Sequence, residues 1–316
     1  MNERGQIFTL DMFFALTLTV LVVSYSGLAL EQARRQADAY ALRYSLERAA
    51  NDAADVLVKT LGRPSNWEEN TETLETLGFA AENGGKAVRN MLEISKFGQL
   101  RRLANYDNWD APVNANAVKA IKEFFGGSEN FEITIFDENG NEMWNAWPRW
   151  KSGEKSGAEN ALEVVVVRRS VVSRYGTVRY GSGDLLNENG GRTVFSTDNF
   201  EIYPGELEAF DWYVILLTTS RSGLPVEIYV NIDPSPPPTY KFNPPYEPEG
   251  DFWPDEHGGM DEYLNVGTNI ITAVSEGKKN TWAMIYLVAV PACSLPENIR
   301  LALSALTATL EVKLWR

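Results

Sequence analysis

The sequence predicts an α+β fold with a long N-terminal membrane-spanning helix, a small helical section, and then a mostly antiparallel β sheet or sandwich. Three observations lead to this prediction. Residues Met12 to Leu30 contain no charged side chain, and residues 31–61 contain neither Gly nor Pro. Beyond about residue 127 the hydrophobic pattern changes from helical spacing to alternation.

The uncharged run is long enough to cross a membrane, because a helix of about 20 apolar residues spans the hydrocarbon core. Asp11 and Glu31 bound this run. It exceeds the apolar region of about 7–15 residues in an ordinary signal peptide, and no A-x-A-like cleavage signal follows it. We therefore expect the segment to stay attached as an anchor.

The helix is expected to continue past the membrane. Apolar side chains recur at three- and four-residue steps along one stripe, which consists of Leu42, Leu46, Ala49, Ala53, Val56 and Leu57. Gly62 and Pro64 then supply a stop signal. Residues 6–61 are thus predicted to form one transmembrane and amphipathic helix.

The first residues, Arg4 through Asp11 (RGQIFTLD), run directly into the apolar helix. This segment resembles the class III signal peptide of archaeal (euryarchaeal) type IV pilins and pilin-like proteins. In that family a prepilin-peptidase-like enzyme cuts after a basic-Gly pair. The resemblance therefore implies a leader of residues 1–5 and cleavage between Gly5 and Gln6.

The resemblance also implies a side of the membrane. It places the bulk of the chain outside the cell, as a single-pass protein of the cell membrane or as part of a surface filament. Arg34 and Arg35 follow the span, and by the positive-inside tendency they favour a cytoplasmic C-terminal part. We follow the resemblance, because prepilin-type segments translocate the chain despite a modest charge bias.

Asp11 has two interpretations. Members of the family commonly carry an acidic residue at the fifth mature position, where it pairs with the new amino terminus of a neighbouring subunit in a filament. Asp11 would be sixth after cleavage before Gln6. The alternative is that Asp11 marks the helix start, where an acid suits the positive end of the helix dipole.

A second resemblance follows the helix. The blocks Gly62-Arg63-Pro64-Ser65-Asn66-Trp67 and Leu77-Gly78-Phe79-Ala80, with a predicted helix over Val88–Leu103, resemble the outer part of euryarchaeal pilin-like proteins. Both resemblances together cover residues 4–136, in patches. Gly62 suits a left-handed helix cap, and Pro64 prevents continuation. Trp67 is then expected to fold back as a core anchor.

Residues 62–127 are predicted to be mainly helical, and residues 128–316 to form a β-rich extracellular domain. Phe131–Phe136 alternates, and the turn from Asp137 to Glu142 leads into Met143–Trp147, which predicts a hairpin. DENGNE lacks the spaced ligands of a calcium loop, so we interpret it as a plain turn. Further predicted strands are 161–172, 177–180, 193–195, 212–218, 226–232, 282–290 and, as a pair, 299–314.

The Pro-rich loop 233–254 is predicted to stay out of any central sheet. Its aromatic residues either pack on the domain or face a peptide or glycan partner; they are Tyr240, Phe242, Tyr246, Phe252 and Trp253.

Composition excludes some functions. The net charge of −14 argues against a nucleic-acid surface, which needs clustered Lys and Arg. The single Cys293 rules out an intramolecular disulfide, and we expect it to be a small buried side chain. No cofactor is predicted.

Candidate site chemistry is sparse. A compact acidic stretch contains the one His and could hold a cation through Asp251, Asp255, His257 and Asp261, although such loops are usually only solvated. No phosphate loop or nucleophile motif occurs, so no catalytic residues are predicted. Catalysis by two converging carboxylates stays open.

The sequence thus predicts a membrane-anchored pilin-like surface protein with a structural or adhesive role, possibly a filament or minor pilin subunit, and not an enzyme. Its expected partners are membrane lipid, a prepilin-peptidase-like enzyme and like subunits or other pilins. The alternative is a membrane-tethered extracellular enzyme or a carbohydrate- or peptide-binding module.

Overall fold

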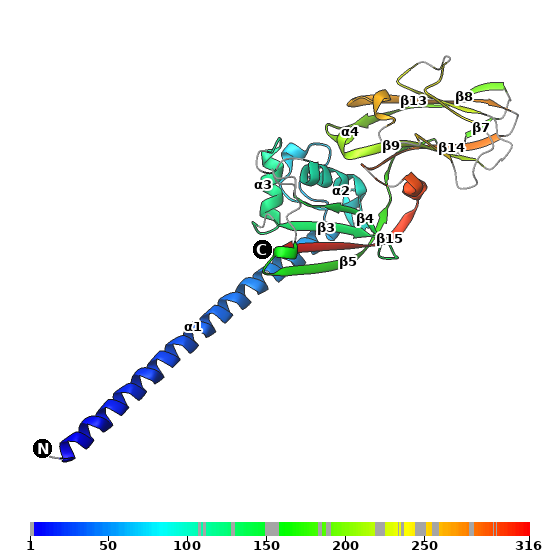
Figure 1. Cartoon of the computed structure of the whole chain (residues 1–316). Coiled ribbons are helices and arrows are strands. Elements are labelled where there is room, and N and C mark those ends of the chain that lie inside the picture. Colours follow the sequence, from blue (N-terminus) through cyan, green and yellow to red (C-terminus); the bar gives the residue numbers. More distant parts are fainter. Residues whose placement is uncertain are drawn as a thin grey trace. The chain divides into compact units, whose positions relative to one another are not determined.

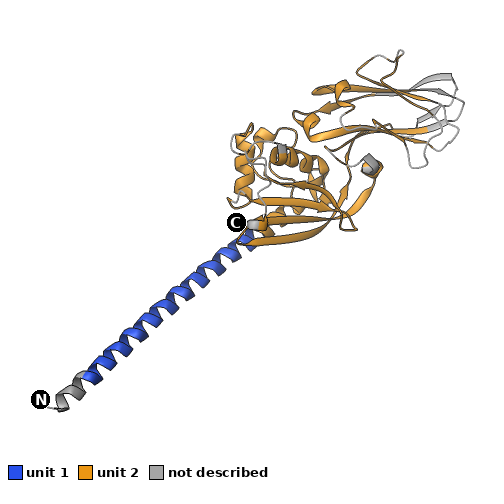
Figure 2. Cartoon of the chain, in the orientation of Figure 1, with its two compact units in different colours: residues 1–49 blue, residues 50–316 orange. Residues whose placement is uncertain are grey.

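The computed structural model describes residues 3–106, 109, 112–127, 130–148, 158–182, 185–187, 191–218, 225–232, 234, 237–243, 251–254, 259–277, 281–292, 294 and 296–316. The chain divides into two compact units, residues 1–49 and residues 50–316 (Figure 2). The described residues form the expected α+β fold, with a long N-terminal helix, few other helices and mostly antiparallel sheets.

The first unit is formed by the greater part of helix α1. This helix spans Glu3–Lys59, so its last ten residues belong to the second unit (Figure 1). All side chains from Leu10 to Ser45 are exposed. The hydroxyl groups of Thr17 and Thr19 each donate to the carbonyl four residues earlier, at 2.8 Å, so these polar atoms are satisfied within the helix. An apolar environment can therefore surround this segment without leaving them unpaired.

The segment after α1 corrects the sequence prediction. Residues 62–127 contain a hairpin, β1 (Ala80–Asn83) and β2 (Lys86–Leu92), as well as helices α2 (Ile94–Arg101) and α3 (Ala115–Phe124). The predicted helix Val88–Leu103 therefore begins only at Ile94. The remaining elements here are a short 3₁₀ turn η1 (Thr71–Thr73) and a π-helical turn η2 (Arg102–Tyr106).

The second unit contains a six-stranded sheet, which we call the host sheet because a second group of strands is inserted into it. Its strand order is β1-β2-β5-β15-β3-β4, with β3 (Phe131–Phe136), β4 (Glu142–Ala146), β5 (Val164–Arg174) and β15 (Ala305–Trp315). The short 3₁₀ turn η3 (Ala158–Asn160) precedes β5. The predicted hairpin is confirmed, because β3 pairs antiparallel with β4. The turn between them is a plain turn, in which the Asp137 carboxylate accepts from the backbone of Asn139 and Asn141 at 2.9 and 2.7 Å.

One face of this sheet carries the helices (Figure 1). Alternate residues of β5 are buried, as a strand with one covered face requires. On the same face Arg169 pairs with Asp55 of α1 at 2.7 Å. Phe125, at the end of α3, stacks on Phe131 with ring centroids 4.3 Å apart. The last ten residues of α1, together with the whole of α2 and α3, therefore share one hydrophobic core with the sheet.

A β-sandwich makes up the rest of the second unit. One sheet has the order β11-β10-β13-β8, and the other has the order β12-β9-β14-β6, with β7 paired to β14. The bounds are β6 (Thr177–Gly181), β7 (Leu185–Asn187), β8 (Gly191–Ile202), β9 (Phe210–Thr218), β10 (Val226–Val230), β11 (Tyr240–Phe242), β12 (Asp251–Trp253), β13 (Gly267–Gly277) and β14 (Thr281–Pro291). Short helical turns are α4 (Glu206–Ala209) and η4 (Asp261–Tyr263). Alternate side chains of both sheets meet in one core, as sandwich packing requires.

The sandwich is inserted into the host sheet. Strand β5 ends at Arg174 and β15 starts at Ala305, and these two residues are register partners of one antiparallel pair. The whole sandwich lies between them in the sequence. The pair runs from Ala305↔Arg174 to Trp315↔Val164, so the two strands are neighbours along their full length.

One strand prediction was wrong, and one central strand was missed. Residues 299–314 do not form two paired strands, because the first part is the 3₁₀ helix η5 (Pro296–Leu303) and only β15 follows. Strand β13 was not predicted, although it is central in its sheet. The predicted strands at 177–180, 212–218, 226–232 and 282–290 are confirmed as β6, β9, β10 and β14.

Helix α2 contacts the sandwich directly. A Cβ atom on Gly98 would lie 2.2 Å from the Phe210 ring, so only glycine permits this approach. Arg101 donates to the carbonyl of Ala292 just beyond β14. The Arg102 guanidinium likewise lies against Gly205, in the turn before α4. These contacts connect the insertion with the host sheet.

Candidate functional site

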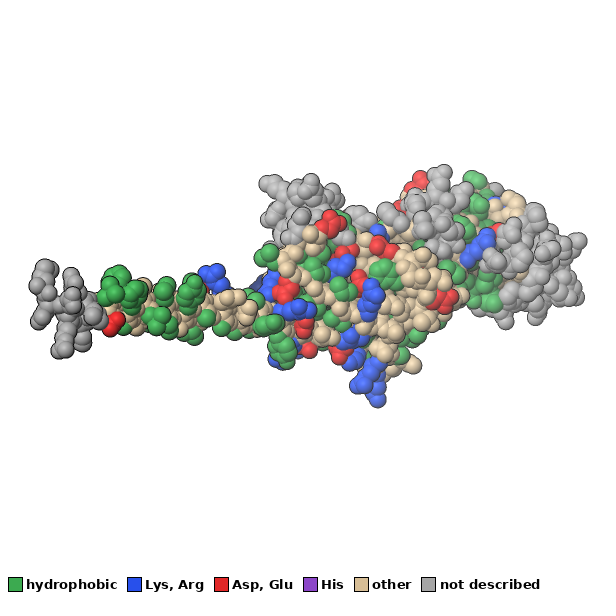
Figure 3. Space-filling model, turned by 60° about the horizontal axis from the view of Figure 1, so that its bottom comes forward, with side chains coloured by type: hydrophobic (Ala, Val, Ile, Leu, Met, Phe, Trp, Pro, Cys, Tyr) green, Lys and Arg blue, Asp and Glu red, His purple; other side chains and the backbone are tan. Residues whose placement is uncertain are grey.

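The first candidate site is the apolar part of α1. Among the described residues this is the one helix that is long and apolar enough to cross a membrane, a property that it shares with signal sequences. Figure 3 shows hydrophobic side chains along this part of the helix, followed by basic ones. Since none of the apolar window is buried within the chain, the structure is compatible with a single-pass anchor.

The predicted processing and pairing residues lie on this helix. Gly5 and Gln6 belong to the first turns of α1, and nothing is described of their side chains. Asp11 is exposed on the helix surface, one residue before the uncharged run. It follows the first turn of α1, and no described residue forms an ion pair with it. Its carboxylate is therefore available to a group outside the chain.

The second candidate site is the structure that ends α1. Gly62 adopts φ +82°, the left-handed conformation expected of a residue that caps a helix. The Arg63–Pro64 peptide bond that follows is cis. Arg63 then pairs with the chain thirteen residues on, because its N–H donates to the carbonyl of Thr76 at 2.8 Å.

Trp67 lies against this helix end. Its side chain is fully buried, and its indole Nε1 donates to the carbonyl of Gly78 at 3.2 Å. A Cβ atom on Gly62 would lie 2.7 Å from the Trp67 ring, and one on Gly78 would lie 2.2 Å from the nitrogen of Gly62. The two sequence blocks that were singled out therefore meet, with both glycines in close contact.

Backbone hydrogen bonds complete this arrangement. We call it the clasp, and define it by Gly62, Trp67 and Gly78 together with Lys96, which is described below. The N–H groups of Phe79 and Ala80 donate to the carbonyls of Leu57 and Thr60 at 2.8 and 2.9 Å. These carbonyls lie in the last turn of α1 and at the residue directly after it, where carbonyl groups lack partners inside the helix. The segment after Trp67 therefore satisfies the end of the helix.

Lys96 was not identified from the sequence. Its side chain is only 3% exposed, and its Nζ donates to the carbonyls of Leu61 and Ser65, both at 2.7 Å. A cation suits the negative end of a helix dipole. The only sequence signal is a lysine inside the apolar face of α2, where every residue from Ile94 to Leu100 is buried.

Glu68 lies beside this lysine, with its Oε2 4.0 Å from the Lys96 Nζ. Burial raises the pKa of the Glu68 carboxyl to about 7, and Lys96 opposes that shift only in part. Burial also lowers the pKa of Lys96. The two pKa values move in opposite directions for one physical reason. Removal from water favours the uncharged form of each group, which is the protonated carboxyl and the deprotonated amine.

The predicted metal ligands are only partly described. Asp251 starts β12 and Asp261 starts η4, whereas Asp255 and His257 lie outside the described residues. Within the part of the chain that the structure describes, no three His, Cys, Asp or Glu side chains gather as metal ligands would. Burial and the nearby Asp211 raise the pKa of Asp261 to about 6. Cys293 also lies outside the described residues.

The aromatic residues of the Pro-rich loop contribute to the sandwich core. Phe242 and Trp253 are buried, and Tyr240 stacks on Trp253 with centroids 4.9 Å apart. Phe252 lies edge-on to Tyr213 at 6.2 Å, and Tyr246 is outside the described residues. Strands β11 and β12 lie at sheet edges, which agrees with the expected exclusion of prolines from central strands.

The structure brings together Gly62, Trp67, Gly78 and Lys96, while Asp11 lies far along the chain on the exposed part of α1. Neither a protein-family model, nor a curated protein, nor a solved structure matches this chain. The functional argument therefore rests on these residues and on the chemistry of the N-terminal segment.

Proposed function

We propose that this chain is a membrane-anchored, pilin-like surface protein with a structural or adhesive role. The observation that carries the proposal is the continuity of α1, which begins at Glu3, includes the Arg4-Gly5-Gln6 motif and contains the uncharged run. The clasp then defines the helix end by capping its carbonyls. A helix of this kind acts as an anchor at one end and as a rigid stem at the other.

The proposed mechanism of anchoring or assembly is helix packing in lipid or in a filament. Small side chains allow helices to approach closely in a membrane, where van der Waals contact replaces the hydrophobic effect. The exposed apolar part of α1 offers such positions at Ala15, Ser24, Ser26, Gly27 and Ala29. In a filament, Asp11 is the group that would pair with the amino terminus of a neighbouring subunit.

Processing is tested by intact mass measurement of the protein from its native membrane. We expect a mature chain beginning at Gln6, with loss of residues 1–5. The substitution Gly5→Val should block cleavage, while Asn2→Ala in the leader should leave it unchanged. A mature chain that still begins at Met1 contradicts the pilin-like proposal.

Assembly is tested by electron microscopy of material sheared from the cell surface. If the chain forms filaments, Asp11→Ala should reduce their number, while Asp38→Ala, an exposed acid farther along the helix, should not. Monomers that stay with the membrane in the wild type favour a tether over a filament subunit.

A tethered binding module is the second candidate function. The observation that favours it is the insertion of a complete sandwich between β5 and β15, which adds a second core without interrupting their pairing. A monomeric, correctly processed protein would support this alternative. The partners proposed for either function are membrane lipid and a prepilin-peptidase-like enzyme, with like subunits added for the filament.

A further inference from the structure

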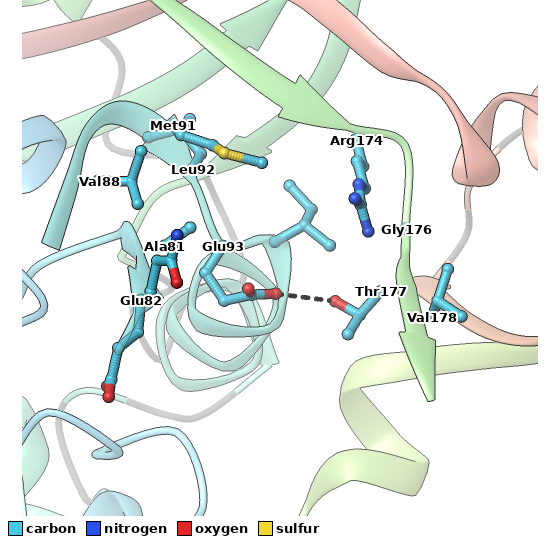
Figure 4. Close-up of a pocket in the computed structure, with 12 residues that line it drawn as sticks. Ala81, Glu82, Val88, Met91, Leu92, Glu93, Arg174, Gly176, Thr177 and Val178 are labelled. Carbon is cyan, nitrogen blue, oxygen red and sulfur yellow. Dashed lines mark hydrogen bonds between the residues drawn. The ribbon is translucent and has the colours of Figure 1, made fainter. Parts of the chain in front are cut away.

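A hollow lies where the host sheet gives way to the sandwich. Its volume of about 390 Å³ is within the range of small-molecule sites. The walls come from the β1–β2 hairpin, the start of α2 and the bend between β5 and β6 (Figure 4). Strand β2 is bridged to β5 only through Met91 and Val172, so the two strands separate beside the hollow.

An irregular pairing shapes one wall. The partner of Ala80 in β2 is Leu92, whereas the partner of Ala81 is Val88, so extra residues of β2 are looped out between them. Asn90 in this bulge has φ +60°, a conformation that is uncommon for a residue other than glycine. Bulges of this kind redirect side chains and occur often beside binding sites.

The described lining combines apolar side chains with three charged ones, Glu82, Glu93 and Arg174. Apolar side chains come from Ala81, Val88, Met91, Leu92, Ile94 and Val178. Figure 4 shows Met91 and Glu93 on the side of β2 and α2 and Arg174 and Thr177 on the side of β5 and β6, with Glu93 hydrogen-bonded to Thr177. Among the described residues, neither Arg174 nor Glu93 takes part in an ion pair. Arg174 and Glu93 therefore bring charges of opposite sign to the wall of a partly apolar space.

Glu93 is held in place for such a role. Its Oε1 accepts hydrogen bonds from the hydroxyl groups of Ser95 and Thr177, both at 3.3 Å. No described residue donates to Oε2, which leaves that oxygen for a ligand. The hydroxyl groups orient the carboxylate without neutralising its charge.

We propose that this hollow binds a free aliphatic α-amino acid. Arg174 receives its carboxylate, Glu93 receives its ammonium group, and the apolar wall takes its side chain. The described part of the lining holds two carboxylates, Glu82 and Glu93, against one guanidinium, which disfavours phosphorylated ligands. Among the described residues that line it none is aromatic, so these residues offer sugars and nucleobases no stacking surface. The inference does not depend on anchoring or assembly.

The test is calorimetric titration of the full-length protein in detergent micelles with L-leucine. We expect a dissociation constant of about 1 mM or tighter, as small ligands with few atoms give. Leucinamide lacks the carboxylate and N-acetylleucine lacks the cation, so each should bind about tenfold more weakly. Equal binding of all three compounds would show that charge recognition is absent and overturn the proposal.

Substitutions assign the two charges. Arg174→Gln should weaken leucine binding about tenfold and leave leucinamide binding unchanged, because that ligand has no carboxylate to lose. Glu93→Gln should weaken leucine binding but not N-acetylleucine binding, and Gln retains an oxygen for Thr177. The matched controls Arg34→Gln and Glu159→Gln, both at exposed positions, should bind leucine as the wild type does.

The proposal fails if leucine at about 10 mM gives no binding heat with the wild type. It also fails if both pocket variants bind leucine as tightly as the wild type. Thermal unfolding of each variant separates loss of binding from loss of fold, because the variants change exposed or half-buried groups and should melt with the wild type.

Discussion

Gly62 and Gly78 decide how α1 ends, because each occupies a place where a side chain would collide. Gly62 combines a positive φ with a neighbouring indole ring, whereas Gly84 in the β1–β2 turn has φ +58° and open space around it. A comparison of substitutions at the two positions therefore separates the energetic cost of backbone strain from the cost of a packing collision. A left-handed conformation alone costs a residue other than glycine roughly 1–2 kcal/mol.

Gly62→Ala should destabilise the protein by about 1–3 kcal/mol more than Gly84→Ala, since only the former drives a methyl group into Trp67. Chemical denaturation of the full-length variants in detergent measures the difference. Equal losses of stability at the two positions would mean that the ring moves aside without cost.

Lys96 and Glu68 give the clasp a dependence on pH. The folded pKa of Glu68 is about 7, above its ordinary value of 4.5, so the folded chain keeps a proton that the unfolded chain releases. This contribution to stability is complete below about pH 4.5 and is lost as the pH rises through 7. Its size is on the order of 2 kcal/mol.

Glu68→Gln should remove this component, so that the variant gains stability over the wild type between pH 5 and 8 by about 2 kcal/mol. Parallel unfolding curves of both proteins across that range measure it. Lys96→Met is the companion variant. It leaves the carbonyls of Leu61 and Ser65 without their charged donor, and should cost about 1–3 kcal/mol in total. An unchanged pH slope in Glu68→Gln would exclude Glu68 as its source.

At the scale of elements, the sequence was most informative where one physical signal acts alone. The uncharged run, the Gly62 stop and the Asp137 turn are local signals, and the structure has the helix, cap and hairpin that they predict. The clasp residues Gly62 and Trp67 were identified for the same reason. Lys96 was not, because its role depends on a helix end more than thirty residues earlier.

The missed elements depend on distant partners. Residues 86–92 (KAVRNML) have helical spacing, but pairing with β1 makes them a strand. Strand β13 includes polar residues such as Asn269, which the sequence pattern does not mark as buried. That side chain is satisfied by Asn231 and by the carbonyls of Asn265 and Gly267. Such networks cannot be read from local alternation.

The apolar part of α1 yields a prediction for the element as a whole. Leu21→Arg places a charge at the centre of the uncharged run, where it opposes insertion by about 2.5–3.5 kcal/mol. We expect a smaller fraction of the protein in sedimented membranes. Ala37→Arg, beyond the run on the same exposed helix, should leave membrane association unchanged. Equal partitioning of the two variants would argue against a membrane-spanning role.

At the scale of the whole molecule, the inserted sandwich determines the organisation of the second unit. Its two ends leave the host sheet at paired residues, and its core is built mainly from its own strands. The sequence predicted β-rich material here but not two separate cores, because β5 and β15 are far apart in the chain. Alternation reveals that a strand has a covered face, not which strand lies beside it.

Replacing residues 175–304 with Asn-Gly should leave a folded host sheet, because that dipeptide closes a two-residue hairpin between paired strands. Loss of the Gly98 and Arg101 contacts should lower its stability. Circular dichroism and thermal unfolding test this. The same deletion combined with Val312→Asp, which puts a charge into the host core, should not fold. A deletion variant without a cooperative transition would mean that the two cores fold only together.

The way in which β5 and β15 carry the sandwich has a mechanical consequence. A load applied to the sandwich enters the host sheet through two adjacent strands at the same end, so it pulls both in one direction and does not separate them. On its other side β15 is hydrogen-bonded to β3 along a ladder from Thr309↔Phe136 to Leu314↔Phe131, so a pull on the pair relative to β3 loads this ladder in shear. In this shear geometry the force acts along the strands, so all hydrogen bonds of the ladder carry it at the same time. A drag force on the sandwich would be resisted by all of them together.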